Sequence, residues 1–253
     1  MFDINETWWG DQRLINIAGV SKSYNKGSVK AVDNLNLHIG PGEIFGFLGP
    51  NGAGKTTTIK MMVGLLNPDC GRISIKGFDI AENPLEAKRQ LGYVPDNPDV
   101  YERLTGLEYL NFLGDVYNVP GKLRKDRMSE LLDMFELKNA APDLIKSYSH
   151  GMKQKIVLIG ALLHDPSVWI LDEPMVGLDP RSSHLLKEYM RSHCDKGNSV
   201  FFSTHILEVA EKLCDRIGII HHGKLIAIGT LEQLRQGEAA ESLENIFLEL
   251  TEK

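Results

Sequence analysis

Residues 49–58 read GPNGAGKTTT, and this stretch decides the fold. It fits the pattern G-x-x-x-x-G-K-[ST]. Glycines lack a Cβ, so consecutive backbone N–H groups can turn inward around an anion. A buried apolar strand at 43–49 precedes the loop, and a helical stretch at 56–66 follows it. This order predicts a loop that wraps the phosphates of a nucleoside triphosphate. The fixed positions are Gly49, Gly54, Lys55 and Thr56.

The side chains of this loop suit a magnesium–nucleotide complex. The helix that begins near Lys55 aims the positive end of its dipole at the bound anion. The Lys55 amine can reach the β- and γ-phosphates, and the Thr56 hydroxyl can ligate Mg²⁺. The residues predicted to bind the nucleotide are Gly49, Pro50, Asn51, Gly52, Ala53, Gly54, Lys55, Thr56 and Thr57.

A second motif places two carboxylates at the end of a strand. Residues 168–174, VWILDEP, form an apolar run that ends in Asp172 and Glu173. Adjacent carboxylates beside a buried strand are costly unless they bind a positive partner. Asp172 suits the acid that holds Mg²⁺ in phosphate-loop enzymes. Glu173 can act as the general base for the attacking water. A strand-end turn without catalytic duty is the alternative.

The rest of the chain alternates short strands with helices. Strands are predicted at 14–20, 29–39 and 199–205, and two more lie within 216–229. Residues 97–165 lack strand signals and form a helical insertion. Alternating strands and helices imply a mostly parallel sheet covered on both faces. The fold class is therefore α/β with an inserted helical segment. Helices of this segment are expected at 104–117, 127–137 and 152–163.

The composition limits the kinds of partner that the protein is expected to bind. The chain has 253 residues, of which 42% are hydrophobic and 25% charged, as in an ordinary soluble globular protein. Its formal net charge is −6, so the whole-surface field does not favour nucleic acid. No apolar run approaches the roughly 20 residues that span a bilayer. We expect a protein that is soluble by itself and reaches a membrane only through a partner.

A third stretch, YSHGMKQK at residues 148–155, raises a question about charge. Ser149 suits a helix N-cap, with His150 and Gly151 in the first turn. No acidic side chain complements the partial positive charge of this helix start. An uncompensated helix start with little side-chain bulk can bind an anion. A plain cap and an anion site are both open at this point.

In order, the segments GPNGAGKTT, YSHGMKQK, ILDEP, GLDP and STH resemble the motifs of nucleotide-binding subunits of ABC transporters. The resemblance implies ATP and Mg²⁺ as cofactors and ATP hydrolysis as the reaction. It implies a RecA-like P-loop NTPase core with a small antiparallel β subdomain and an inserted helical subdomain. The implied parts of the single domain 1–253 are an N-terminal extension (1–13), core and β subdomain (14–96 and 166–230), the helical subdomain (97–165) and a helical tail (231–253).

The resemblance also assigns roles to residues. Lys55 and Thr56 would bind phosphate and Mg²⁺, and Asp172 would be the Walker B acid. Glu173 would be the catalytic carboxylate. His205 of STH would be the switch histidine that contacts the γ-phosphate.

The resemblance assigns two further roles, to Asp179 and to Tyr24. Asp179 of GLDP would be the D-loop residue that acts across a dimer. Tyr24 would stack on adenine, since a π-face gives affinity without strong base selectivity. A tyrosine packed at a strand end is the alternative for Tyr24.

In this family two ATPase subunits dimerise head to tail, as a homodimer or a heterodimer, with each ATP between one phosphate loop and the partner's signature segment. The resemblance therefore implies that the anion at YSHGMKQK is the γ-phosphate of the ATP bound by the partner chain. His150 stands where a glycine is usual, so its imidazole either adds a donor to the interface or faces solvent. The signature residues implied to meet the partner's ATP are Ser149, His150, Gly151 and Met152.

This form of the signature resembles the single-domain ATPases of type-two ABC exporters, whose membrane-spanning permease subunits are separate chains. It implies a motor subunit at the cytoplasmic face of a bacterial membrane. Contacts with the permease are expected near residues 96–108, with Tyr101 and Leu104 as candidates, and simple local packing is the alternative for both. A soluble ABC-class ATPase of DNA repair or translation is the alternative, which the single compact motif set and the net acidity disfavour. The N-K-x-D motif of GTPases is missing.

Two positions depart from the family pattern. Asp96 stands where many relatives have a glutamine that contacts Mg²⁺ and the attacking water. A modified metal contact and a turn residue without catalytic duty are both open for it. Trp8 and Trp9 have no counterpart, and one of them is expected to pack on the core while the other is exposed.

Overall fold

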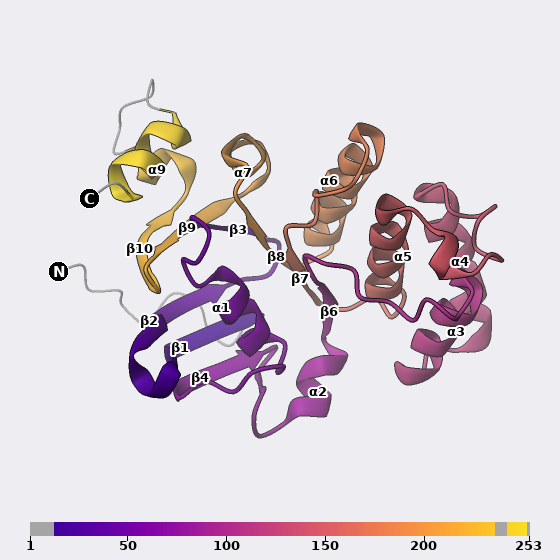
Figure 1. The fold of residues 1–253 in the computed structure, drawn as a ribbon, viewed down its shortest axis with the longest axis horizontal. Coiled ribbons are helices and arrows are strands. Elements are labelled where there is room, and N and C mark those ends of the chain that lie inside the picture. Colours follow the sequence, from indigo (N-terminus) through magenta and orange to yellow (C-terminus); the bar gives the residue numbers. More distant parts are fainter. Residues whose placement is uncertain (1–12, 236–241, 252–253) are drawn as a thin grey trace.

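The computed structural model describes residues 13–235 and 242–251. Figure 1 shows an antiparallel sheet at one end, a central sheet, and a group of helices at the other end. Trp8 and Trp9 lie outside the described residues, so their predicted packing is not addressed. Within the described part, no helix is long and apolar enough to cross a bilayer.

Six strands form the central sheet in the order β10-β9-β3-β8-β7-β6. All neighbouring strands run parallel except β10, which pairs antiparallel with β9. This mostly parallel sheet agrees with the α/β prediction. The strands are β3 (Ile44–Leu48), β6 (Leu91–Val94), β7 (Val168–Asp172), β8 (Ser199–Thr204), β9 (Arg216–His221) and β10 (Lys224–Gly229).

A second sheet is antiparallel and has the order β2-β1-β4-β5. The predicted small antiparallel β subdomain is thus confirmed. Strand β1 continues four residues beyond its predicted end, because register shifts let it keep pairing with β2 up to Tyr24. The strands are β1 (Ile15–Tyr24), β2 (Val29–Ile39), β4 (Cys70–Ile75) and β5 (Phe78–Asp79).

Three helices occupy the segment between β6 and β7, as predicted. They are α3 (Gly106–Val116), α4 (Gly121–Met134) and α5 (His150–Leu162). Helix α4 begins six residues before the predicted start, directly after Pro120. Its first turns are charged and mostly solvent-facing, so they lack the apolar periodicity that marks a helix in sequence.

The remaining helices surround the two sheets. Helix α1 ends at Met62 rather than near residue 66, because Gly64 turns the chain at a φ of 67°. The short helix α2 was not predicted. These helices are α1 (Lys55–Met62), α2 (Pro84–Arg89), α6 (Pro180–Asp195), α7 (Leu207–Leu213), α8 (Leu231–Leu234) and α9 (Leu243–Thr251), with 3₁₀ turns at Asn25–Gly27 and Ile145–Ser147.

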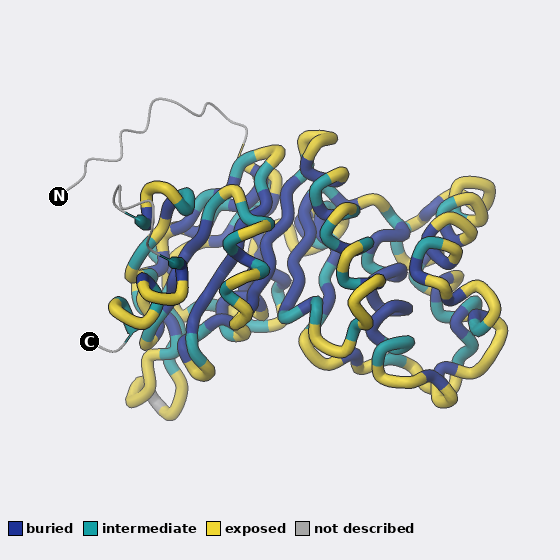
Figure 2. The backbone as a smooth tube through the Cα atoms, turned by 90° about the horizontal axis from the view of Figure 1, so that it is seen from above, coloured by how far each residue is buried: buried dark blue, intermediate teal, exposed yellow. Residues whose placement is uncertain are grey.

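The central strands are buried on both faces, which explains their continuous apolar sequence. Phe45 and Phe201 belong to the core beneath α1 and the antiparallel sheet. Trp169 and Phe202 belong to the core beneath α5 and α6. Figure 2 shows these strands as buried segments through the middle of the molecule. A rigid sheet therefore holds the loops at its edge.

His193 of this framework is buried, and His164 is partly buried. The His164 ring stacks on Tyr117 with 3.7 Å between centroids, and His193 stacks on Trp169 at 4.0 Å. Burial lowers the pKa of both His164 and His193 to about 4. Both are therefore neutral in the folded protein at neutral pH.

Folding stability should fall as the pH falls from about 6.5 to about 4. The unfolded chain takes up these protons near pH 6.5, whereas the folded chain does so near pH 4. The stabilisation is complete above pH 6.5, and about 2 kcal/mol per histidine is lost at pH 5. Urea unfolding at pH 7 and pH 5 measures the difference. It should shrink in His164→Gln and persist in the exposed-site control His184→Gln; an unchanged difference in His164→Gln would contradict the assignment.

Candidate active site

Four parallel strands carry their functional residues to one edge of the sheet. β3, β8, β7 and β6 are consecutive neighbours, so the loops after them lie side by side. Ligands of open α/β sheets bind at the carboxyl ends of the strands. The segments concerned are the phosphate loop after β3, His205 after β8, Glu173 after β7 and Asp96 after β6.

The phosphate loop bends back on itself before helix α1. Gly52 and Gly54 have φ values of 79° and 113°, a region that L-residues with side chains rarely adopt. A Cβ at Gly54 would collide with the carbonyl oxygen of Ala31. Gly54 is the N-cap of α1, and the first turn of that helix contains no acidic residue. The loop thus offers free backbone donors and a positive helix end to an anion.

Lys55 is held inside the loop. Its Nζ donates to the carbonyl oxygens of Gly49 at 2.6 Å and Pro50 at 3.3 Å. Burial lowers the pKa of Lys55, while the carboxylates of Glu173 and Asp172 oppose that shift. The ammonium therefore lies in a partly dehydrated site, where its charge acts strongly on a phosphate.

Asp172 is buried at the end of β7. Its Oδ1 accepts a hydrogen bond of 2.5 Å from the Ser203 hydroxyl, and burial raises its pKa. A side-chain hydrogen bond from Thr56 and the Ser203 bond act in the opposite direction. The predicted metal-binding pair, Thr56 and Asp172, lines the same cavity. Ser203 was missed as a site residue, although it precedes Thr204 and His205 in the STH motif.

Glu173 adopts a strained backbone conformation with a φ of 49°. The Ser203 hydroxyl accepts its backbone N–H at 3.1 Å. Its carboxylate contacts His205, with 3.0 Å between Oε2 and Nδ1. The Glu173 side chain is 13% exposed and that of His205 is 59% exposed. The strained turn therefore aims a carboxylate at the strand edge with a histidine beside it.

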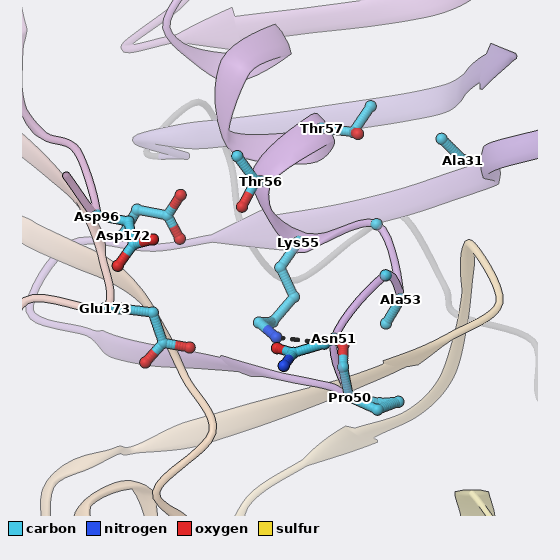
Figure 3. A pocket seen from close by; sticks show the side chains of 12 residues that line it. Ala31, Pro50, Asn51, Ala53, Lys55, Thr56, Thr57, Asp96, Asp172 and Glu173 are labelled. Carbon is cyan, nitrogen blue, oxygen red and sulfur yellow. Dashed lines mark hydrogen bonds between the residues drawn. The ribbon is translucent and has the colours of Figure 1, made fainter. Parts of the chain in front are cut away.

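The phosphate loop, Asp172 and Glu173 line a cavity of about 200 Å³, whereas His205 is not among its lining residues. Figure 3 shows Lys55 and the loop on one side, and Asp96, Asp172 and Glu173 on the other. Ala31 also lines the cavity, although the sequence offered no signal for it. The lining residues are Ala31, Pro50, Asn51, Gly52, Ala53, Gly54, Lys55, Thr56, Thr57, Asp96, Asp172 and Glu173.

Tyr24 lies outside this cavity at the end of β1. Its side chain is 41% exposed, and it pairs across the strands with the exposed Val29. Val29 lies two residues from Ala31, which lines the cavity. Tyr24 and Val29 therefore form an exposed cross-strand pair of the antiparallel sheet, two residues along β2 from the cavity.

The signature segment lies apart from this cavity in the same chain. Ser149 caps α5, and its hydroxyl accepts the Met152 N–H at 3.3 Å. The first turn of α5 contains no acidic residue, as predicted. None of Ser149, His150, Gly151 and Met152 lines the cavity. The start of α5 therefore takes no part in the nucleotide cavity of its own chain.

Asp179 caps helix α6. Its carboxylate accepts from the Ser182 N–H and hydroxyl at 2.9 and 2.7 Å, and it pairs with Lys155 at 2.9 Å. These bonds hold the pKa of Asp179 well below its usual range. Lys155 lies on α5, so the ion pair joins the signature helix to the turn after Glu173.

This sheet edge, with its glycine-rich loop, helix start and paired acids, defines a P-loop NTPase. Residues 32–176 match the ABC transporter family. The chain belongs to this family and is an ATP-hydrolysing ATP-binding subunit.

Individual relatives support this assignment. The chain is 39% identical to the linearmycin resistance ATP-binding protein LnrL of Bacillus subtilis, over 87% of this chain and 70% of LnrL. It is 36% identical to the ABC-type transporter ATP-binding protein EcsA of the same organism, over 95% and 97%. The daunorubicin/doxorubicin resistance ATP-binding protein DrrA of Streptomyces peucetius is 38% identical, over 88% of this chain and 67% of DrrA.

Solved structures agree with the fold. An ATP-binding subunit of an ABC transporter superposes with a TM-score of 0.90 and 36% identity, covering 94% of this chain and 99% of that one. The dimeric ATP-binding cassette MJ0796, in a post-hydrolysis state bound to ADP and Pi, has a TM-score of 0.76 and 26% identity, covering 86% and 98%. The transporter interpretation is thus supported, and the DNA-repair or translation alternative is not.

Proposed function

We propose that this chain is the motor subunit of a bacterial ABC exporter and closes as a head-to-tail dimer on two Mg-ATP. The observation that carries the proposal is the cavity in which Lys55 faces Asp172 and Glu173. Export is supported by relatives named for resistance to linearmycin and to daunorubicin/doxorubicin, and by a Nod factor export ATP-binding protein of Burkholderia pseudomallei.

In the proposed reaction, the protein positions ATP and activates water. The loop N–H groups and Lys55 bind the phosphates and counter the charge that builds up during transfer. Glu173 accepts a proton from the water that attacks the γ-phosphorus, and ADP leaves with the bridging oxygen. His205 lies beside Glu173 and is assigned to the γ-phosphate and to orienting that carboxylate.

The donor set fits Mg²⁺. Thr56, Asp172 and Asp96 supply only oxygen atoms, the ligands that Mg²⁺ prefers. Among the described residues, no group of three or more His, Cys, Asp and Glu side chains could hold a metal by itself. Mg²⁺ is usually bound in nucleotide sites through one or two carboxylates together with substrate phosphates. When bound, Mg²⁺ would neutralise phosphate charge.

Asp96→Gln should leave ATP hydrolysis within about tenfold of the wild type, which is ~1.4 kcal/mol of barrier. Asp96 lines the cavity, but its carboxylate also adds negative charge beside Asp172. Glutamine removes that charge and keeps an oxygen that can contact the ion or the water. Steady-state phosphate release measures the rate. A collapse to the rate of Glu173→Gln would mean that the carboxylate is essential.

The dimer is proposed because the signature segment of one chain does not line the nucleotide cavity of that chain. Residues 149–152 do not line the cavity. The first turn of α5 contains no acidic residue that would offset the partial positive charge of the helix start. A second copy turned head to tail would bring its α5 to this cavity. Each ATP would then join two chains, and hydrolysis would remove the bridging charge.

The permease contact is proposed at an exposed aromatic pair. Tyr101 and Phe112 are 64% and 45% exposed, and their rings meet edge to face with 5.9 Å between centroids. Leu104, the other candidate, is partly buried, and its backbone bonds to Tyr101 and Ile145. Tyr101 with Phe112 therefore presents more apolar surface to a partner than Leu104 does.

Co-expression with the membrane protein encoded next to this chain tests the function. The expected partner has about six apolar spans, each of roughly 20 residues, and no ATPase domain. The chain should sediment with membranes only when this partner is present, and Tyr101→Ala should reduce its recovery there. Co-purification with a soluble repair or ribosomal complex, without a membrane partner, would contradict the proposal.

A further inference from the structure

The sequence did not show what the His150 side chain contacts. A Cβ built on Gly177 would lie 2.5 Å from Cδ2 and 2.9 Å from Nε2 of the His150 ring. The imidazole therefore fills the space that a side chain at position 177 would need. Gly177 has a φ of 79°, so glycine is favoured there for conformational reasons as well. The ring packs on the turn that follows the catalytic carboxylate.

The neighbouring residue touches the same turn. A Cβ at Gly151 would lie 2.7 Å from the carbonyl oxygen of Gly177, closer than real Cβ atoms approach. The backbone of α5 and the turn are therefore in direct contact. The Lys155–Asp179 ion pair holds the same two segments together one helical turn further on. The start of α5 and the turn 173–179 are thus packed as one unit.

The turn leads directly to Glu173. The Val176 N–H donates to the Glu173 carbonyl oxygen at 3.1 Å, and the Leu178 N–H donates to Met175 at 3.3 Å. Because Glu173 itself has a φ of 49°, its side-chain direction depends on the geometry of this short turn. A displacement of Gly177 would therefore change where the Glu173 carboxylate points.

We propose that His150 is a positioning residue for Glu173. Its ring couples the start of α5, which would meet the partner's nucleotide, to the catalytic carboxylate of its own chain through Gly177. The inference rests on the proposed head-to-tail dimer. His150 is exposed, and the Cδ2–Nε2 edge of its ring lies at Gly177, so the ring is assigned to the turn and to solvent rather than to the partner's phosphate.

The physical basis is packing of a rigid ring on a backbone turn. Packed contacts transmit displacement because close-packed groups have few alternative arrangements. A glycine at position 150 would leave the Cα of Gly177 uncovered and allow the turn to shift relative to α5. The Lys155–Asp179 pair would still tether the two segments. Loss of the ring should therefore loosen the coupling without separating the segments.

The first test is His150→Gly, assayed for hydrolysis and for dimerisation. We expect kcat to fall about fivefold with an unchanged KM for ATP, because the carboxylate is misdirected while the nucleotide loop is intact. In a Glu173→Gln background, ATP-driven dimerisation should persist within about twofold in Kd. An unchanged kcat, or loss of the dimer in His150→Gly, would overturn the proposal.

Two further variants separate packing from hydrogen bonding. His150→Phe keeps a flat ring but has no donor, so it should retain most of kcat; an equal loss in Phe and Gly variants would overturn the packing argument. Gly177→Ala should impair hydrolysis more in the wild-type background than in His150→Gly, since only the former contains the ring that the new Cβ displaces. Strictly additive losses would contradict direct coupling.

The tests distinguish this inference from the proposed function. If Glu173→Gln with His150 intact fails to dimerise on ATP, the head-to-tail dimer is wrong and the proposed coupling falls with it. If that protein dimerises and His150→Gly retains full kcat, the dimer stands and the positioning role is wrong.

Discussion

Replacing Glu173 by glutamine is expected to slow ATP hydrolysis about a thousandfold while ATP still binds. The amide is nearly the same size as the carboxylate but cannot accept the proton of the attacking water. Because Lys55 and the phosphate loop are unchanged, the nucleotide should remain bound and unhydrolysed. The variant should therefore accumulate the ATP-bound dimer.

Phosphate release and size-exclusion chromatography with Mg-ATP measure the two effects. The matched control is Glu188→Gln, an exposed glutamate of α6 far along the helix from its cap. It should hydrolyse ATP like the wild type and remain monomeric under the same conditions. Near-wild-type hydrolysis by Glu173→Gln would contradict its catalytic role, and a persistent monomer would count against the head-to-tail dimer.

Gly54→Ala is expected to weaken ATP binding at least about a hundredfold, or ~2.7 kcal/mol. The residue has a φ of 113°, and a Cβ there would collide with the Ala31 carbonyl oxygen and crowd Ile220. Relief of that clash requires the loop to move away from β2 or to abandon the conformation that aims its N–H groups inward. Either change disrupts the anion site.

Gly52→Ala is the matched control, because it lies in the same loop with a φ of 79° but its Cβ would meet nothing within 4 Å. It carries only the conformational cost, so a loss of about tenfold is expected. Titration with a fluorescent ATP analogue measures both Kd values, and circular dichroism checks that both variants fold. Equal losses would show that strain alone, and not the contact with Ala31, makes glycine necessary at Gly54.

Much of the site was predictable because its chemistry is local. The phosphate loop and the pair Asp172–Glu173 each lie within a few consecutive residues. The strand before each motif was visible as a continuous apolar run. The predicted start of helix α4 was six residues too late, because its first turns are charged and mostly solvent-facing and so carry no apolar pattern.

Other features required the folded chain. Ser203 bonds to Asp172 from a neighbouring strand, and Ala31 lines the cavity from the antiparallel sheet. Ala31 has no distinctive local pattern, and the STH motif does not show that Ser203 reaches Asp172, because each acts through strand register and sheet packing. The contact between His150 and Gly177 is of the same kind, since it joins segments separated by a buried strand.

The sequence by itself determined the chemistry: a loop that binds phosphates, a carboxylate that can activate water, and a helix start that lacks acidic residues. These depend on residue type and short spacing, which the chain carries before it folds. Only the tertiary structure decided how the parts are connected, because strand order and side-chain packing set distances between residues far apart in the chain. It placed Asp96 at the cavity, His205 beside Glu173, and the ring of His150 on the turn that orients that carboxylate.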